Sequence, residues 1–202
     1  VALDGSMVDD IPQLRDEENE VLTAPFSEKE VFDAISQMEN NKPPGPDGVP
    51  AEFYKKCWGI IKGGLMPMFQ DLFNGHLQLF KLNFGTITLL PKKAEVICIE
   101  QFMPICLLNV SFKIFTKVGT NRLTQIAHSM VQPTQTAFMP GRHILEGVVV
   151  LHETLHEIHS KKLDGVVFKV DFEKAYDKVK WLFLQQALRM KGFDEAWRKQ
   201  VE

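Results

Sequence analysis

The sequence predicts an α+β fold that is rich in helix, and three observations support this class. Apolar residues recur at helical spacing in several segments, among them 27–39, 109–130 and 179–191. Two apolar, partly β-branched runs, 84–90 and 102–108, flank a polar segment, which is typical of a β-hairpin. A third such run, 166–170, predicts a buried strand.

Length and composition indicate an ordinary globular protein. The 202 residues are 45% hydrophobic, enough for one or two domains with a sizeable core. No apolar run approaches 18 residues and no secretion signal opens the chain, so we expect no membrane partner. The cysteines lack C-x-x-C spacing, and their odd number predicts reduced thiols in an intracellular protein of the cytoplasm or nucleus. They are Cys57, Cys98 and Cys106.

Charge is distributed unevenly along the chain. The formal net charge is −3, but residues 1–20 alone carry −6, which leaves +3 on the remainder. Because acidic, non-periodic segments cannot bury a core, we expect 1–20 to be a disordered lead-in. The mildly basic remainder neither requires nor excludes nucleic acid as a partner.

A helix is predicted to begin just after Ser27. Ser27 is a favourable N-cap, Glu30 three residues later predicts a capping box, and Phe26 with Val31 would form a hydrophobic staple. The helix is expected to reach about residue 39. Its buried stripe would comprise Val31, Ile35 and Met38.

The middle of the chain alternates between loops and regular elements. Four prolines and two glycines make 40–50 a loop, followed by helices at 51–58 and 65–73, with Pro67 near the first turn of the second. Residues 84–108 form the predicted hairpin with a long tip. The helix after it, 109–130, is expected to bury a face comprising Phe112, Phe115, Val118, Arg122 and Ile126.

Residues 166–192 predict a strand, an aspartate, a turn and a helix. Asp171 follows the strand directly, and a carboxylate there costs free energy to desolvate unless a cation binds it. A divalent metal is the usual such cation in phosphoryl-transfer sites. A helix N-cap or a solvated carboxylate explains a single aspartate equally well. The helix would begin at Val179 and end before Gly192, a suitable C′ cap.

The wording F-K-V-D-F-E-K-A-Y-D-K-V, at 168–179, resembles motif A of LINE-type, non-LTR retrotransposon reverse transcriptases, particularly those common in plants. The segments 42–49, 107–118 and 132–142 are also similar to that family, and the resemblance extends from about Leu22 to the end. It implies the fingers and first part of the palm of a right-hand polymerase, truncated, with fingers over 21–160 and palm over 161–202.

The resemblance implies roles for five residues of an RNA-directed DNA polymerase. Asp171 would be catalytic and, with the backbone carbonyl of Phe172, would hold Mg²⁺. Tyr176 would exclude a ribose 2′-hydroxyl, Lys92 would pair with the triphosphate, and Arg142 would reach a template or nucleotide phosphate. The implied partners are an RNA template, a DNA primer and deoxynucleotide triphosphates. From local sequence alone, Lys92 and Arg142 are equally well explained as surface residues.

Two departures from the family bear on activity. Where the family has D-[FY]-R-P-I-S-L, this chain has Q-F-M-P-I-C-L, so Met103 replaces an arginine that contacts the triphosphate. A thioether cannot replace a guanidinium fork. The single Asp-Asp pair, Asp9 and Asp10, precedes motif A and is interpreted as coincidence, so motif C is missing. We therefore expect a fragment that is inactive alone, although the family is enzymatic.

Two other function classes remain open. His152, Glu153 and His156 form H-E-x-x-H on a predicted helix, the pattern of zinc hydrolases. No convincing third ligand follows, Glu173 being the only near candidate, and the resembled family often carries this stretch without a metal role, so no zinc is expected. The histidines should face solvent, with the core face comprising Val148, Leu151, Leu155 and Ile158. The other class is a catalytically dead RNA-binding module.

Overall fold

The computed structural model describes residues 12–78, 80, 82–170 and 178–201. The chain divides into two compact units, Ala24–Arg122 and a second one that combines Val1–Thr23 with Leu123–Glu202. This division does not coincide with the expected borders at 20 and 160. The assignment of fingers and palm to those ranges therefore remains a prediction.

The unit Ala24–Arg122 packs helices around one apolar core. It contains α2 (Glu28–Ser36), α3 (Ala51–Lys56), α4 (Trp58–Phe73) and most of α5 (Val110–Met130). Phe69 lies at the centre, with its ring centroid 5.2 Å from that of Phe26 and 4.3 Å from that of Phe115. The buried core residues are Val31, Ala34, Ile35, Ala51, Leu65, Phe69, Val110, Ile114, Phe115 and Val118.

Helix α2 begins as predicted but ends earlier than predicted. The Ser27 hydroxyl accepts a hydrogen bond from the Glu30 backbone N–H at 3.2 Å, and Val31 and Ile35 are fully buried. The helix stops at Ser36, three residues before the expected end. The capping box is only half formed, because Arg122 engages the Glu30 carboxylate.

Helix α4 is longer than the sequence predicted. Cys57 caps the end of α3, and α4 begins at the next residue, Trp58. Pro67 therefore lies in the interior of α4 and not in its first turn. An interior proline removes a backbone hydrogen bond. The helix nevertheless continues through Pro67, because Leu65 and Phe69 on either side of it are buried in the core.

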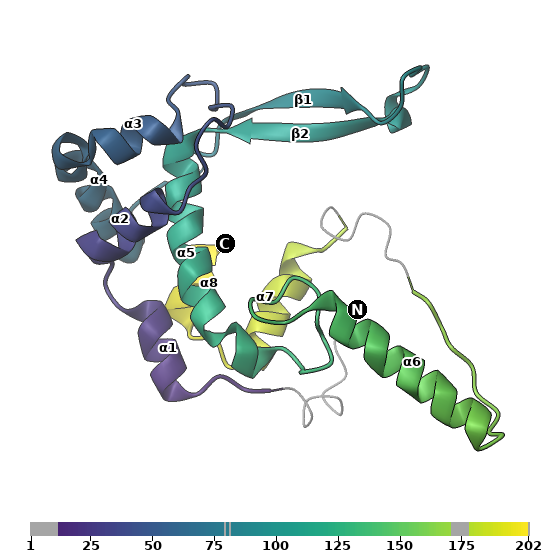
Figure 1. Cartoon of the computed structure of the whole chain (residues 1–202). Coiled ribbons are helices and arrows are strands. Elements are labelled where there is room, and N and C mark those ends of the chain that lie inside the picture. Colours follow the sequence, from purple (N-terminus) through teal and green to yellow (C-terminus); the bar gives the residue numbers. More distant parts are fainter. Residues whose placement is uncertain (1–11, 79, 81, 171–177, 202) are drawn as a thin grey trace. The chain divides into compact units, whose positions relative to one another are not determined.

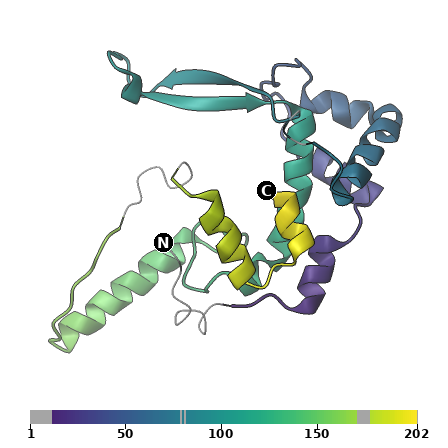
Figure 2. The same ribbon diagram turned by 180° about the vertical axis from the view of Figure 1, so that it is seen from behind.

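The predicted β-hairpin is confirmed. Strands β1 (Gly85–Pro91) and β2 (Phe102–Leu108) pair antiparallel, and the short 3₁₀ helix η3 (Ile99–Gln101) closes the tip. Gly85 sits opposite Leu108, where a Cβ atom would lie 2.7 Å from Cys106 Sγ. All of β1 after Gly85 is exposed, so the hairpin projects from the helices of its own unit (Figures 1 and 2).

The second unit has a smaller core. It contains α1 (Asp16–Thr23), the end of α5, α6 (Ile144–Ser160), α7 (Trp181–Met190) and α8 (Glu195–Val201). Its buried apolar residues are Leu14, Leu22, Ile126, Phe193 and Trp197. The expectation of a disordered lead-in over 1–20 is wrong for 16–20, which lie in α1; residues 1–11 are outside the described part of the chain.

The predicted cap at Gly192 is confirmed in detail. Helix α7 begins at Trp181, two residues later than expected, and Gly192 adopts φ +77° after its last turn. The Gly192 N–H donates to the Arg189 carbonyl and the Phe193 N–H donates to the Leu188 carbonyl, both at 3.1 Å. Phe193 and Leu188 share the apolar cluster, which completes a Schellman motif.

The predicted buried strand at 166–170 is not formed. These residues have no strand pairing, and the exposed fractions of Val166 and Phe168 are 77% and 85%. A strand needs a neighbour for its backbone groups, and the two-stranded sheet of the described residues does not include this segment. Within the described ranges, no helix is both long and apolar enough to cross a membrane.

Candidate functional site

The hairpin register places Met103 near the tip of the hairpin, where Lys92 directly follows β1. Met103 lies opposite Leu90, and the Lys92 N–H donates to the Gln101 carbonyl at 2.9 Å, which continues the ladder past Pro91. Lys92 itself lies at a bend directly after β1, opposite Gln101 of η3, so it is two residues beyond the Leu90–Met103 pair.

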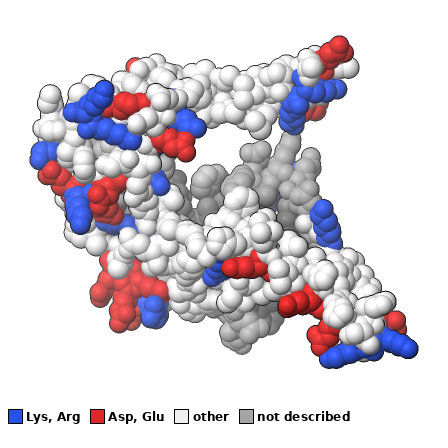
Figure 3. All heavy atoms as spheres, viewed as in Figure 1, with Lys and Arg blue, Asp and Glu red and all other residues white. Residues whose placement is uncertain are grey.

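Both side chains are accessible at this position. Met103 is 48% exposed, and Lys92 is exposed with its ammonium donating to the Glu100 carbonyl at 3.0 Å. An ammonium has three donors, so this bond leaves Lys92 with further hydrogen-bonding capacity. Figure 3 shows the body of the hairpin without charged groups, while Lys and Asp or Glu side chains gather at its tip. Lys92, Lys93, Glu95 and Glu100 belong to that tip.

Arg142 holds together the loop between α5 and α6. Its Nη1 atom donates to the carbonyls of Gln132 and Gln135 at 2.6 and 2.8 Å, and its Nη2 atom donates to that of Val131 at 3.1 Å. This geometry gives Arg142 a clear structural role. Its assignment to a template or nucleotide phosphate stays a prediction.

The residues predicted to contact the metal and the sugar belong to motif A. Asp171, Phe172 and Tyr176 lie outside the described residues. Of the other residues with expected roles, Lys92 and Met103 belong to the unit Ala24–Arg122, and Arg142 belongs to the second unit.

The H-E-x-x-H helix does not pack as predicted. His152, Glu153 and His156 are exposed on α6 as expected, but Val148, Leu151 and Leu155 are exposed too, contrary to prediction. Only Ile158 of the expected core face is half-buried, against Gly165. No described element covers the rest of that face. The described residues also contain no group of three His, Cys, Asp or Glu side chains arranged to hold a metal, so the hydrolase alternative gains no support.

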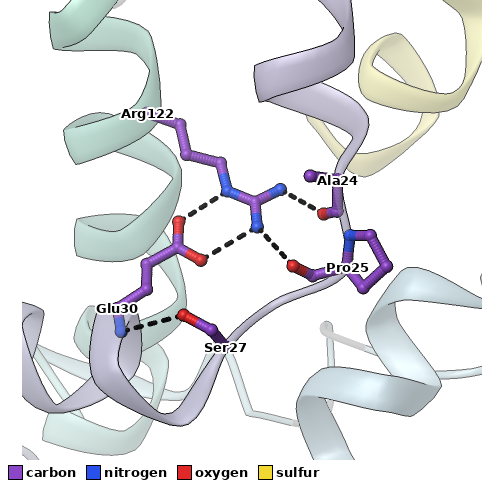
Figure 4. A network of polar contacts seen from close by, with 5 residues as sticks. All are labelled: Ala24, Pro25, Ser27, Glu30 and Arg122. Carbon is purple, nitrogen blue, oxygen red and sulfur yellow. Dashed lines mark hydrogen bonds and ion pairs between the residues drawn. The ribbon is translucent and has the colours of Figure 1, made fainter.

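The partners of one buried polar residue were not predicted. Arg122 is 3% exposed and donates to Glu30 and to the carbonyls of Ala24 and Pro25 (Figure 4). Its guanidinium carbon also lies 4.1 Å from the centroid of the Phe26 ring. The sequence did hold a signal, because an arginine on an otherwise apolar helix face has to be paired when it is buried.

Comparison with known proteins decides the family. Residues 90–201, more than half of the chain, match the family described as reverse transcriptase (RNA-dependent DNA polymerase). The chain belongs to the reverse transcriptase family. This confirms the resemblance on which the predicted roles depend.

Its relatives are proteins of non-LTR retrotransposons. The chain is 29% identical over 92% of its length to the transposon TX1 uncharacterized 149 kDa protein of Xenopus laevis. It is 26% and 25% identical, over 76% and 84% of its length, to retrovirus-related Pol polyproteins of type-1 retrotransposable elements, R1 of Bradysia coprophila and R2 of Nasonia vitripennis. These animal relatives support the LINE type but not the expected plant affinity.

The reverse transcriptase match covers every residue to which a role was assigned. It begins at Leu90 and so includes the end of β1 with Lys92 after it, all of β2 with Met103, the Arg142 loop and motif A. The chain spans 14–16% of the length of these three relatives. The roles of its residues within a whole enzyme are therefore proposals.

Proposed function

We propose that this chain is part of the RNA-directed DNA polymerase of a non-LTR retrotransposon, and that it supplies the fingers (21–160) and the start of the palm (161–202) of a right-hand polymerase. The observation that carries the proposal is the exposed hairpin that has Met103 on β2 and Lys92 directly after β1, close to its tip. From Leu90 onward, including Lys92 and all of β2, this hairpin lies within the region that matches the family. An exposed hairpin with a cation near its tip suits contact with an incoming triphosphate.

The reaction is nucleotidyl transfer, and the residues of this chain mainly bind and orient. Lys92 offers a flexible point charge to the triphosphate, and Tyr176 lies against the sugar and rejects a 2′-hydroxyl. Positioning and charge neutralisation supply most of the catalysis in such reactions.

Asp171 and the Phe172 carbonyl fit a magnesium ion by donor chemistry, because carboxylate and carbonyl oxygens are the ligands that Mg²⁺ prefers. When bound, Mg²⁺ would neutralise charge on the phosphates and on the departing pyrophosphate. One carboxylate cannot hold two ions. The two-metal reaction therefore needs ligands beyond these.

Met103 favours a second candidate, an RNA-binding module without catalytic activity. The thioether cannot make the charge-assisted bonds of the arginine that the family has there. The chain would then keep its phosphate contacts to nucleic acid while using nucleotides poorly. Both candidates predict nucleic-acid binding, and only the first predicts incorporation once the missing ligands are supplied.

Binding to an RNA–DNA template–primer at several salt concentrations tests the shared part of the proposal. Affinity should fall linearly with salt on logarithmic axes, and replacing Lys92 and Lys93 by alanine should reduce the slope by about 2. A matched control replaces Lys161 and Lys199, which form exposed ion pairs with Glu157 and Glu195, and should leave the slope unchanged. No binding at low salt, or equal slopes in all three proteins, would contradict the proposal.

A further inference from the structure

On the β2 side, the β1–β2 hairpin is joined to its helical core by a single residue, Asn109. Strand β2 ends at Leu108 and α5 begins at Val110, which is buried in the core. Because β1 is exposed after Gly85, and Leu107 and Leu108 at the base of β2 are only half-buried, packing of the strands does not by itself fix the direction of the hairpin. The contacts at its base have to do so.

Asn109 contacts both the hairpin and the proline-rich loop between α2 and α3. Its backbone N–H donates to the Phe84 carbonyl at 3.4 Å, which closes the base of the hairpin. Its side-chain oxygen accepts a hydrogen bond from the Asp47 N–H at 3.2 Å. Figures 1 and 2 both show this loop at the base of the hairpin.

Gly45 brings the loop into direct contact with Asn109. A Cβ atom at Gly45 would lie 2.4 Å from the Asn109 nitrogen and side-chain oxygen and 2.5 Å from its Cα atom. No side chain fits there unless the backbone moves, because real Cβ contacts are not that short. The Gly48 N–H donates to the Gly45 carbonyl at 3.0 Å, and the Val49 N–H donates to Asp47 Oδ1 at 3.0 Å, which holds the loop in this shape.

We infer that Gly45 and Asn109 are positioning residues, which fix the direction of the hairpin and thereby the place of Lys92 relative to the core of the unit Ala24–Arg122. The hairpin acts as a lever. Its strands have 7 residues each, or roughly 23 Å at about 3.3 Å per residue. A 10° rotation at Asn109 would move the tip by about 4 Å, more than a hydrogen bond to a phosphate tolerates.

Only the consequence for Lys92 rests on the proposed polymerase function. The mechanical part concerns this chain alone. It also explains why the loop must contain glycine at 45, where the φ angle itself imposes no such need.

The test is a distance measurement by pulsed electron paramagnetic resonance on the 202-residue protein. One spin label is placed on Cys98 near the hairpin tip and the other on an Ile60→Cys site in α4; both positions are exposed. Cys57 and Cys106 are replaced by serine so that only these two sites react. The parent should give one narrow distance distribution.

Four variants then separate positioning from general destabilisation. Gly45→Ala and Asn109→Ala should shift or broaden the distribution by about 4 Å, as expected for a rotation of roughly 10° over strands of this length. Asn109→Asp keeps the acceptor for the Asp47 N–H and should restore the parental distribution. Gly64→Ala is the matched control, because a Cβ there meets no atom within 4 Å.

Each outcome has a definite meaning. Folded Asn109→Ala protein with the parental distribution would overturn the inference, as would an Asn109→Asp distribution as broad as that of Asn109→Ala. Far-UV circular dichroism checks folding, and the Asn109 pair decides the result even if Gly45→Ala does not fold. No nucleotide or nucleic acid is present, so the result does not depend on whether the polymerase proposal holds.

Discussion

Arg122 and Glu30 form a bidentate ion pair between α5 and α2 inside the unit Ala24–Arg122. The Arg122 Nε atom donates to Glu30 Oε1 at 2.6 Å and Nη2 donates to Oε2 at 2.9 Å. The exposed fraction of the arginine side chain is 4% and that of the glutamate side chain is 23%. This pair joins residues 92 positions apart and fixes the start of α2 against α5.

Replacing Arg122 by methionine should destabilise the protein by about 3 kcal/mol, the lower end of the range for breaking a buried pair, because Glu30 keeps some exposure to water. Urea denaturation followed by circular dichroism measures the change. The control Lys199→Ala breaks an exposed pair with Glu195 and should cost about 0.5 kcal/mol or less. Similar losses in the two variants would contradict a structural role for the buried pair.

The second unit should lose stability at acidic pH because of Glu18. Hydrogen bonds from the Arg15 side chain and backbone N–H and from the Ser129 hydroxyl lower the pKa of Glu18 from 4.5 to about 2. A lowered folded-state pKa adds stability at pH values above 4.5, and this stability is lost as the pH falls toward 2. Urea denaturation at pH 6 and pH 3 should show a smaller pH effect in Glu18→Gln than in the parent. An equal pH effect in both would show that Glu18 is not the group responsible.

Any side chain at position 192, after the last turn of α7, should destabilise the protein. Its φ of +77° lies in the left-handed region, where a non-glycine residue loses about 1–2 kcal/mol, and Gly192→Ala should be destabilised by that amount. Gly64→Ala in the interior of α4 should instead be neutral or stabilising, because alanine favours a helix. Thermal unfolding of the two variants, compared with the parent, measures both effects; a Gly192→Ala protein as stable as the Gly64→Ala protein would contradict the cap.

Replacing Met103 by the arginine of the family should increase the catalytic efficiency of nucleotide incorporation. A hydrogen bond to a charged group contributes about 1.5–3 kcal/mol, so Met103→Arg should raise kcat/KM for the deoxynucleotide about 10- to 100-fold in a fusion that supplies the remaining palm and thumb of a complete relative. The control is Leu89→Arg. Leu89 pairs with Pro104, so this variant places the same charge on the other face of the hairpin from Met103. An equal gain from both arginines would indicate a general charge effect and not a triphosphate contact.

Local signals predicted most helices and the hairpin. Ser27 caps α2, Gly192 ends α7 with a left-handed residue, and β1 pairs with β2, all as expected, because each depends on residues close in sequence. Periodicity also placed Ile126 and Val118 on the buried side of α5.

The wrong predictions depended on distant partners. Periodicity identifies the apolar face of α6 but not whether another element covers it, and Leu151 is exposed. The run 166–170 has strand composition, but the described residues provide no neighbouring strand. Glu30 suited a capping box locally, but Arg122, far along the sequence, binds its carboxylate. Of the candidate site, sequence predicted the residue types at Lys92 and Met103, and only the register shows that Met103 pairs with Leu90, two residues before Lys92.

Primer extension on an RNA template with Mg²⁺ tests most directly whether this chain supplies the fingers and motif A of a polymerase. The proteins are the 202-residue chain, its fusion to the palm and thumb of a complete non-LTR reverse transcriptase, and the Asp171→Ala form of that fusion. We expect DNA product from the fusion only, because one aspartate cannot hold two metal ions and Asp171 is required when the others are supplied. Extension by the fusion that persists in Asp171→Ala, or extension by the 202-residue chain alone, would contradict the account.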